Sequence, residues 1–114
     1  MANLCYGILN ATGTKSALSR FATNACHAVV SEDGNTIRIN DIKYVTGTSG
    51  GFAYSDDPIR FKQAEPTFII EDIYCISIPF EQKWDIRAED LKNLSRIYSV
   101  DFSISAHEPG FKSK

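Results

Sequence analysis

The chain has 114 residues and a formal net charge of −2, with 43% hydrophobic and 23% charged residues. This length and composition fit a single globular domain over residues 1–114 and exclude a disordered chain, a collagen and a coiled coil. The small acidic excess argues against a protein that covers nucleic-acid phosphates with a concentrated basic face.

The first third of the chain predicts a strand followed by a helix. Residues 4–11 carry almost no charge and have apolar side chains at both alternating positions, which is typical of a central strand. Gly13-Thr14-Lys15-Ser16 lacks the upstream glycine and the full spacing of a phosphate-binding loop, so we interpret it as an ordinary helix cap. A helix is expected near residues 14–27, because one helical face collects the apolar residues Leu18, Phe21, Ala22, Ala25 and Cys26.

The middle of the chain predicts short strands and then a long loop. Strands are expected at residues 36–39, 42–45 and 52–54, separated by turn residues and by a flexible glycine-rich loop at residues 46–51. Residues 55–66 are charged and contain two prolines, so the whole stretch of about 46–66 is expected to be a long surface excursion. Loops of this length in a compact domain often carry the function.

The second half predicts a strand, a helix and a final strand. Residues 67–80 alternate as a strand does, and Pro79 favours a place at an edge or an end of the sheet. A helix over residues 86–98, capped by Asp85, is followed by alternating residues from Val100 to Ala106. This order predicts an α+β fold, a ferredoxin-like split β-α-β sandwich whose antiparallel sheet carries both helices on one face, with a frayed tail at residues 109–114.

The sequence contains no recognisable catalytic or metal-binding motif. His27 and His107 have no nucleophile beside them in a known arrangement. Cys5, Cys26 and Cys75 lack zinc-site spacing; Cys5 and Cys75 have the potential to meet across a sheet, but no further ligand accompanies them. We therefore expect a non-enzymatic protein with no metal or cofactor. Because neither a secretory signal nor a membrane-spanning stretch is visible, a cytoplasmic location is expected.

Several short motifs resemble a family of mobile-element proteins. The relevant residues are Met1-Ala2-Asn3, Cys5, Thr12-Gly13, Phe80-Glu81, Lys83-Trp84, Asp85, Leu91, Leu94-Ser95 and Glu108-Pro109-Gly110-Phe111. Together they resemble the phage and plasmid proteins of the YubB type, which carry a ferredoxin-like domain. The resemblance implies a phage or plasmid origin and a bacterial host cytoplasm, and it leaves residues 35–66 without a counterpart.

Charge is unevenly distributed, and this suggests a binding surface. Residues 55–108 carry six basic and eleven acidic side chains. We expect a partner to be bound by the carboxylates and the single tryptophan of this half, namely Asp56, Asp57, Glu65, Glu71, Asp72 and Trp84.

Two functions fit this surface. The first is inhibition of a host nucleic-acid-targeting defence complex, in the manner of an anti-CRISPR protein, by occupation of a surface of a host defence protein or ribonucleoprotein. The alternative is a nucleic-acid-binding accessory protein that uses the open face of its sheet. Direct nucleic-acid binding is the weaker hypothesis, because the last strand offers Asp101, Ser103 and Ser105 on its polar face.

Overall fold

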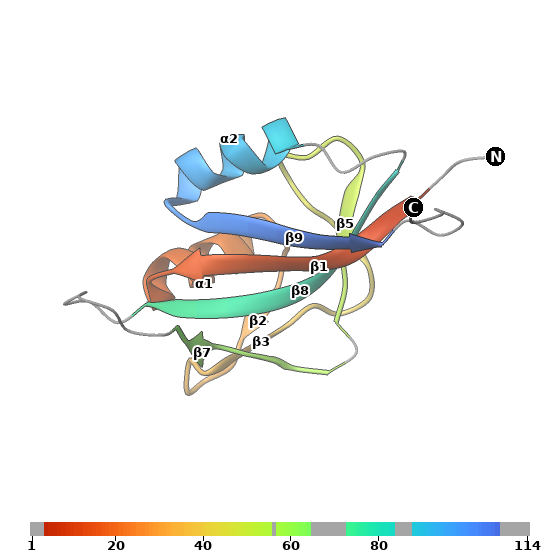
Figure 1. Ribbon diagram of the computed structural model, residues 1–114. Helices are drawn as coiled ribbons and strands as arrows, with labels where there is room; N and C mark the ends of the chain where they lie inside the picture. The colour runs from red at the N-terminus through yellow and green to blue at the C-terminus, as the bar shows by residue number, and fades with distance from the viewer. Residues whose placement is uncertain (1–3, 56, 65–72, 84–87, 108–114) are drawn as a thin grey trace.

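The computed structural model describes residues 4–55, 57–64, 73–83 and 88–107 (Figure 1). They form an α+β fold with two helices and antiparallel sheets. The elements in chain order are β1 (Leu4–Gly13), α1 (Lys15–Asn24), β2 (Val29–Val30), β3 (Thr36–Arg38), β4 (Lys43–Tyr44), β5 (Gly51–Ala53), β6 (Ile59–Arg60), β7 (Lys62–Gln63), β8 (Tyr74–Lys83), α2 (Ala88–Tyr98) and β9 (Asp101–His107).

The larger sheet is built around β1 and β8. Its strand order is β4-β5-β8-β1-β9, and β7 also pairs with β8. β1 is antiparallel to both β8 and β9, and β5 and β7 are antiparallel to β8. A smaller sheet has the order β2-β3-β6. The prediction of a central first strand is therefore confirmed, and the smaller sheet is an addition that the sequence pattern did not indicate.

Pro79 lies in a central strand, yet it disturbs no ladder. On the side of β8 away from β1, β5 pairs with residues 80–82 and β7 pairs with residues 74 and 75. Pro79 falls in the gap between them, where its carbonyl accepts a hydrogen bond from the Tyr54 N–H at 3.2 Å. Since the N–H and C=O of a residue in an antiparallel strand point to the same side, the missing N–H of Pro79 also faces the gap.

Both helices contribute to one core on one side of the larger sheet. Fully buried Phe21 of α1 contacts the rings of Tyr98 at the end of α2 and Phe102 in β9, with centroid separations of 5.7 and 4.9 Å. The inward residues of the sheet complete this core: Leu9, Ala11, Ile76, Ile78 and Phe80. Figure 1 shows α1 behind the sheet, so no helix of the described residues covers the face turned toward the reader.

Both predicted helices are present: α1 is shorter than the expected 14–27, and α2 ends at Tyr98 as expected, while residues 86 and 87 lie outside the described residues. The Thr14 side chain caps α1 by accepting a hydrogen bond from the Ala17 N–H at 3.1 Å, which confirms the capping interpretation. The helix ends at Asn24, because the chain turns just beyond it and His27 has a positive φ of 59°. Asp85 and residues 67–72 and 109–114 lie outside the described residues.

The predicted loop over residues 46–66 is wrong as a single excursion. β5 at residues 51–53 overlaps the short strand expected at residues 52–54, but the part expected to be charged loop, residues 55–66, contains β6 and β7. Buried Phe61, between β6 and β7, anchors this stretch to the core. A strand of two residues, bounded by proline or charged residues, is too short for an alternation of apolar and polar side chains to be recognised from the sequence.

The glycine-rich loop at residues 46–51 is packed and hydrogen-bonded, contrary to the expectation of a flexible loop. The hydroxyl of buried Thr48 donates a hydrogen bond to the carbonyl of Val45, just before the loop, at 2.7 Å. Buried Gln82 of β8 donates to the Ser49 carbonyl at 2.8 Å and to Asp90 Oδ2 at 3.1 Å. The Ser49 N–H also donates to Asp90 Oδ2, at 2.9 Å. These bonds join the loop to both β8 and α2.

Gly51 is the position in this loop where a side chain has least room. A Cβ there lies 2.6 Å from Thr48 Oγ1 and 2.9 Å from Phe80 Cζ. We expect Gly51→Ala to lower the free energy of unfolding by about 1–3 kcal/mol, because the buried Phe80 ring must shift. Urea unfolding followed by circular dichroism measures this loss. Gly13→Ala, whose nearest atom is 3.4 Å away, is the control; an equal loss in both variants contradicts the packing argument.

Candidate binding surface

The structure describes one of the six residues predicted to bind a partner. Asp57 is exposed, and its backbone carbonyl accepts a hydrogen bond from the Ser55 hydroxyl. The other five lie outside the described residues: Asp56, Glu65, Glu71, Asp72 and Trp84. The proposed acidic surface as a whole therefore stays a prediction, and the described neighbours of Asp57 define what surrounds it.

Three adjoining hollows lie around Pro58 and Arg38, and each is lined by at least one of these two residues. The largest, of about 520 Å³, is lined by Asp57, Arg60 and Lys62 among others. The second, of about 420 Å³, includes Arg38 and Ile42. The third, of about 280 Å³, is lined by Val29, Ser31, Thr36, Arg38, Asn40 and Pro58. Because the second and third share Arg38 and the first and third share Pro58, the hollows form one continuous surface. We call it the Pro58 surface: Val29, Arg38, Ile42, Asp57, Pro58, Arg60 and Lys62.

The alternation of side chains along the strands of the smaller sheet determines which residues reach the Pro58 surface. Val29 stands opposite Arg38, and Thr36 stands opposite Arg60, in the antiparallel register. Since side chains alternate between the two faces of a strand, the residues between them turn to the other face. Ile37 is accordingly fully buried. Thus one face of the smaller sheet closes the core and the other presents arginines to solvent.

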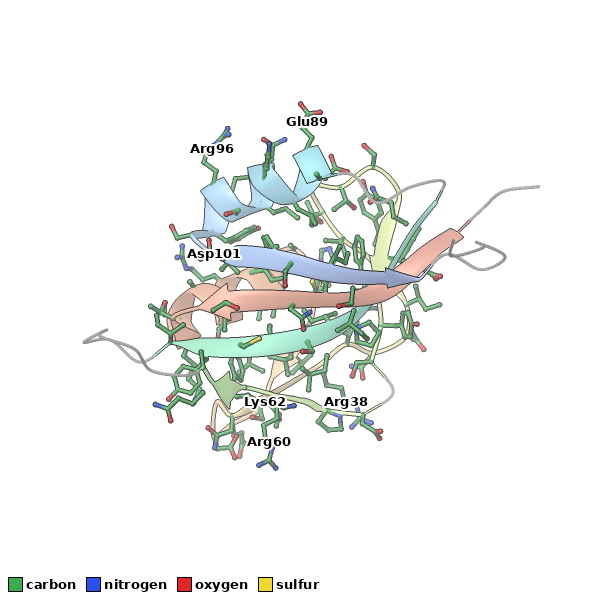
Figure 2. All side chains as sticks on the ribbon, viewed as in Figure 1. Arg38, Arg60, Lys62, Glu89, Arg96 and Asp101 are labelled. Atoms are coloured by element: carbon green, nitrogen blue, oxygen red, sulfur yellow. The ribbon has the colours of Figure 1, made fainter. Side chains whose placement is uncertain are left out.

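The described part of the Pro58 surface is basic. Arg38, Arg60 and Lys62 are all exposed, and none forms an ion pair with another described residue. Figure 2 shows the three side chains along the same border of the molecule. Among the described residues that line the three hollows, these three cations accompany two exposed carboxylates, Asp41 and Asp57, whereas the sequence predicted an acidic surface around Asp57.

Two exposed aliphatic side chains lie among these cations. Val29 is 59% exposed and lines the third hollow; Ile42 is 60% exposed and lines the second. Arg38 lines both hollows and so lies next to both apolar residues. Apolar side chains combined with arginine are typical of protein–protein interfaces. Sequence reasoning missed Val29, Arg38 and Ile42, because isolated residues in short strands give no signal of exposure.

The uncovered face of the larger sheet has a polar, uncharged centre. Its central row pairs Asn10 with Ser77 and Ser103, and the Ser77 hydroxyl donates to Asn10 Oδ1 at 2.7 Å. The described aromatic side chains of this face, Tyr44 and Phe52, contact each other with ring centroids 5.7 Å apart. The face therefore offers small hydroxyl and amide groups at its centre rather than a row of stacked aromatic rings.

The described thiols and histidine are not assembled into a reactive site. Burial raises the pKa of the Cys26 thiol to about 12, so it stays protonated near neutral pH. The backbone register places Cys5 opposite Gln82 and Cys75 opposite Thr12, at different positions along β1. His27 is exposed, with Nε2 at 3.0 Å from Thr46 Oγ1.

Local hydrogen bonds and ring contacts explain the environments of two further charged groups, Asp33 and Lys15. The Ser31 hydroxyl and the Asn35 N–H both donate to the Asp33 carboxylate, at 2.6 and 3.0 Å, and lower its pKa. Lys15 donates to Asn35 Oδ1 at 2.9 Å and lies over the rings of Phe61 and Tyr74. These interactions fix a turn beside the first turn of α1.

Within the described residues, no three side chains of the metal-ligating types form a cluster.

Neither described helix has the length and apolarity that a membrane-spanning helix needs. Comparisons of the chain with protein-family models, with curated proteins and with solved structures gave no match.

Proposed function

We propose that this protein is a non-enzymatic binding protein, encoded on a phage or plasmid, that inhibits a host nucleic-acid-targeting defence complex by occupying a surface of that complex. The Pro58 surface supports the binding part of this proposal. The motif resemblance to mobile-element proteins of the YubB type supports the part that concerns origin and target.

The observation that carries the proposal is the combination of exposed apolar residues and arginine around Pro58. Val29 and Ile42 offer aliphatic surface whose burial favours association, at about 25 cal/mol per Å² before the costs of binding. Arg38 between them supplies a planar donor for a carboxylate of the partner. The hollows accept protruding side chains, so the surface favours a folded protein as partner.

We also propose that the larger sheet and its two helices are a ferredoxin-like domain. The order β5-β8-β1-β9, with β1 antiparallel to both neighbours, supports this assignment. Helix α1 connects β1 to the strands that lead to β5, and α2 connects β8 to β9. On this view β2 and β3 are inserted between α1 and the second strand of the domain, β5, and β6 and β7 are inserted between β5 and the third strand, β8. Together these insertions carry the Pro58 surface.

Nucleic-acid binding is the second candidate, and the basic charge of the Pro58 surface favours it. Arg38, Arg60 and Lys62 form a cationic border that would attract phosphates. The exposed Asp57 among them opposes this reading, and so does the uncharged centre of the open sheet face. The geometry therefore favours a protein partner over a phosphate backbone.

A plating assay tests the proposed function. Bacteria whose defence system targets a phage are given the wild-type gene or a variant, in parallel for several defence systems. We expect the wild type to raise plating by at least about tenfold against one of them, and Arg38→Glu to abolish the rise by reversing a central charge. Arg20→Glu, an exposed arginine on α1, is the matched control and should keep full activity.

Two further arms separate the alternatives. Asp56→Lys with Asp57→Lys reverses the acidic residues predicted from sequence; if this variant fails while Arg38→Glu stays active, the contact surface is acidic. A gel shift with RNA and DNA, repeated at rising salt, examines the second candidate. Tight, salt-sensitive binding to nucleic acid by the wild type, without any gain in plating, would contradict the inhibitor proposal.

A further inference from the structure

A second surface lies at the other end of the sheet, between α2 and β9. Strand β9 is the last strand of the larger sheet and pairs with β1 alone. A groove of about 740 Å³ runs beside it, lined by Ala88, Leu91, Lys92, Ser95, Arg96, Asp101, Phe102, Ser103 and Ile104. It shares none of these residues with the Pro58 surface.

The backbone of β9 has hydrogen-bonding groups along this groove that no described residue uses. In an antiparallel strand, every second residue turns its N–H and C=O away from its neighbour. β1 uses one edge of β9, and no described residue outside β1 forms a backbone hydrogen bond with residues 101–107. An unpaired edge of this kind is a template for one further strand.

The groove has an apolar floor and cationic walls. Leu91, Phe102 and Ile104 are half-buried and supply the floor. Lys92 and Arg96, one helical turn apart on α2, are exposed and have no ion pair with a described residue. Asp101 places a carboxylate at one end of the groove. Figure 2 shows Asp101 on the same side of the molecule as Arg96. A ligand that fits is therefore apolar with a negative charge near Lys92.

We propose that this groove binds an extended segment of another protein by β-strand addition to β9, and that the segment carries aliphatic side chains and a carboxylate on the face turned toward α2. Main-chain bonds to β9 would hold the segment, and alternate side chains would enter the groove. Leu91, Phe102 and Ile104 would select the aliphatic residues, and Lys92 with Arg96 the carboxylate.

A second copy of the chain fits this edge less well. Figure 1 shows α2 beyond β9, on the side where an added strand would lie. Two copies joined through β9 would therefore bring their two α2 helices against each other, with like charges on Lys92 and Arg96. A single strand without its own helix avoids this conflict. The inference is independent of the function proposed for the Pro58 surface.

The test uses the full chain and the peptide acetyl-Thr-Val-Thr-Glu-Thr-Val-Thr-amide, which places two valines and one glutamate on the same face of a strand. We expect saturable binding, with NMR shifts confined to residues 88–107. Lys92→Glu should weaken binding at least about tenfold, and a peptide with Lys in place of Glu should then be preferred. Arg20→Glu, which reverses an exposed cation on the other helix, should bind as the wild type does.

Backbone methylation distinguishes strand addition from simple charge attraction. Two versions of the peptide carry N-methyl groups on alternate sets of residues. Only one set of N–H groups faces β9, so one version should lose binding and the other retain it. Absence of saturable binding at millimolar peptide, equal binding by both methylated versions, or a dimer of the free protein in sedimentation that peptide does not dissociate would each overturn the proposal.

Discussion

Replacing Phe21 with alanine is expected to lower the free energy of unfolding by about 3–5 kcal/mol. Phe21 is fully buried in α1, and its ring joins three elements through edge-on contacts with Tyr98 and Phe102. Its removal takes away the transfer free energy of a whole aromatic ring and leaves a cavity where both helices and β9 meet. A loss of this size is a large fraction of the stability of a small domain.

Urea unfolding followed by circular dichroism measures the Phe21→Ala loss. Phe52→Ala is the matched control, because Phe52 is only half-buried and its ring contacts Tyr44 at the border of the sheet. We expect a clearly smaller loss for the control. Equal losses for the two variants would show that the core does not centre on the meeting point of α1, α2 and β9.

Replacing Leu94 with alanine is expected to lower the free energy of unfolding by about 2–5 kcal/mol. Leu94 is the buried residue of α2, and it packs against the loop at residues 46–51: a Cβ added to Gly47 lies 2.8 Å from Leu94 Cδ2. Truncation at residue 94 therefore loosens α2 from that loop as well as from the sheet.

Ile97→Ala on the same helix is the control for Leu94→Ala. Ile97 is 63% exposed, so its truncation should change the free energy of unfolding by no more than about 0.5 kcal/mol. Thermal or urea unfolding of the two variants provides the comparison. A change well under 1 kcal/mol for Leu94→Ala, or a larger one for Ile97→Ala, would mean that the buried face of α2 has been assigned to the wrong residues.

The long elements could be predicted because their periodicity extends over many residues. The helical spacing of Leu18, Phe21 and Ala22 identified the buried face of α1, and Thr14 identified its beginning. The alternation in residues 101–105 identified β9, with Phe102 and Ile104 packed inward. In each case the hydrophobic pattern and the local capping or turn residues agree.

Of the inserted strands, only β3 falls within a strand expected from the sequence, at residues 36–39; the others could not be predicted, because they are too short to show a period. β2, β6 and β7 have two residues each, and their partners are fixed by tertiary contacts such as the burial of Phe61. Pro79 was expected at an edge or an end, whereas it lies in a gap between two strands that share one side of β8. That arrangement depends on where β5 and β7 stop.

The candidate surfaces were hidden from sequence for a related reason. The net charge of a stretch of sequence shows only which charges are close along the chain. The Pro58 surface instead brings Arg38 together with Arg60 and Lys62, which are more than twenty positions away in the sequence. The groove beside β9 depends on β9 being the last strand of the sheet, which strand order decides and periodicity does not.

Competition on a purified complex tests the proposed inhibition most directly. The defence complex identified by plating is loaded with fluorescent target nucleic acid, and the anisotropy is followed as this protein is added. We predict that the wild type and Arg20→Glu lower the bound fraction to a saturable limit, and that Arg38→Glu requires at least about tenfold more protein for the same effect. Unchanged anisotropy with the wild type at saturating concentrations, or an equal effect of wild type and Arg38→Glu, would contradict the proposal that the Pro58 surface occupies a site on that complex.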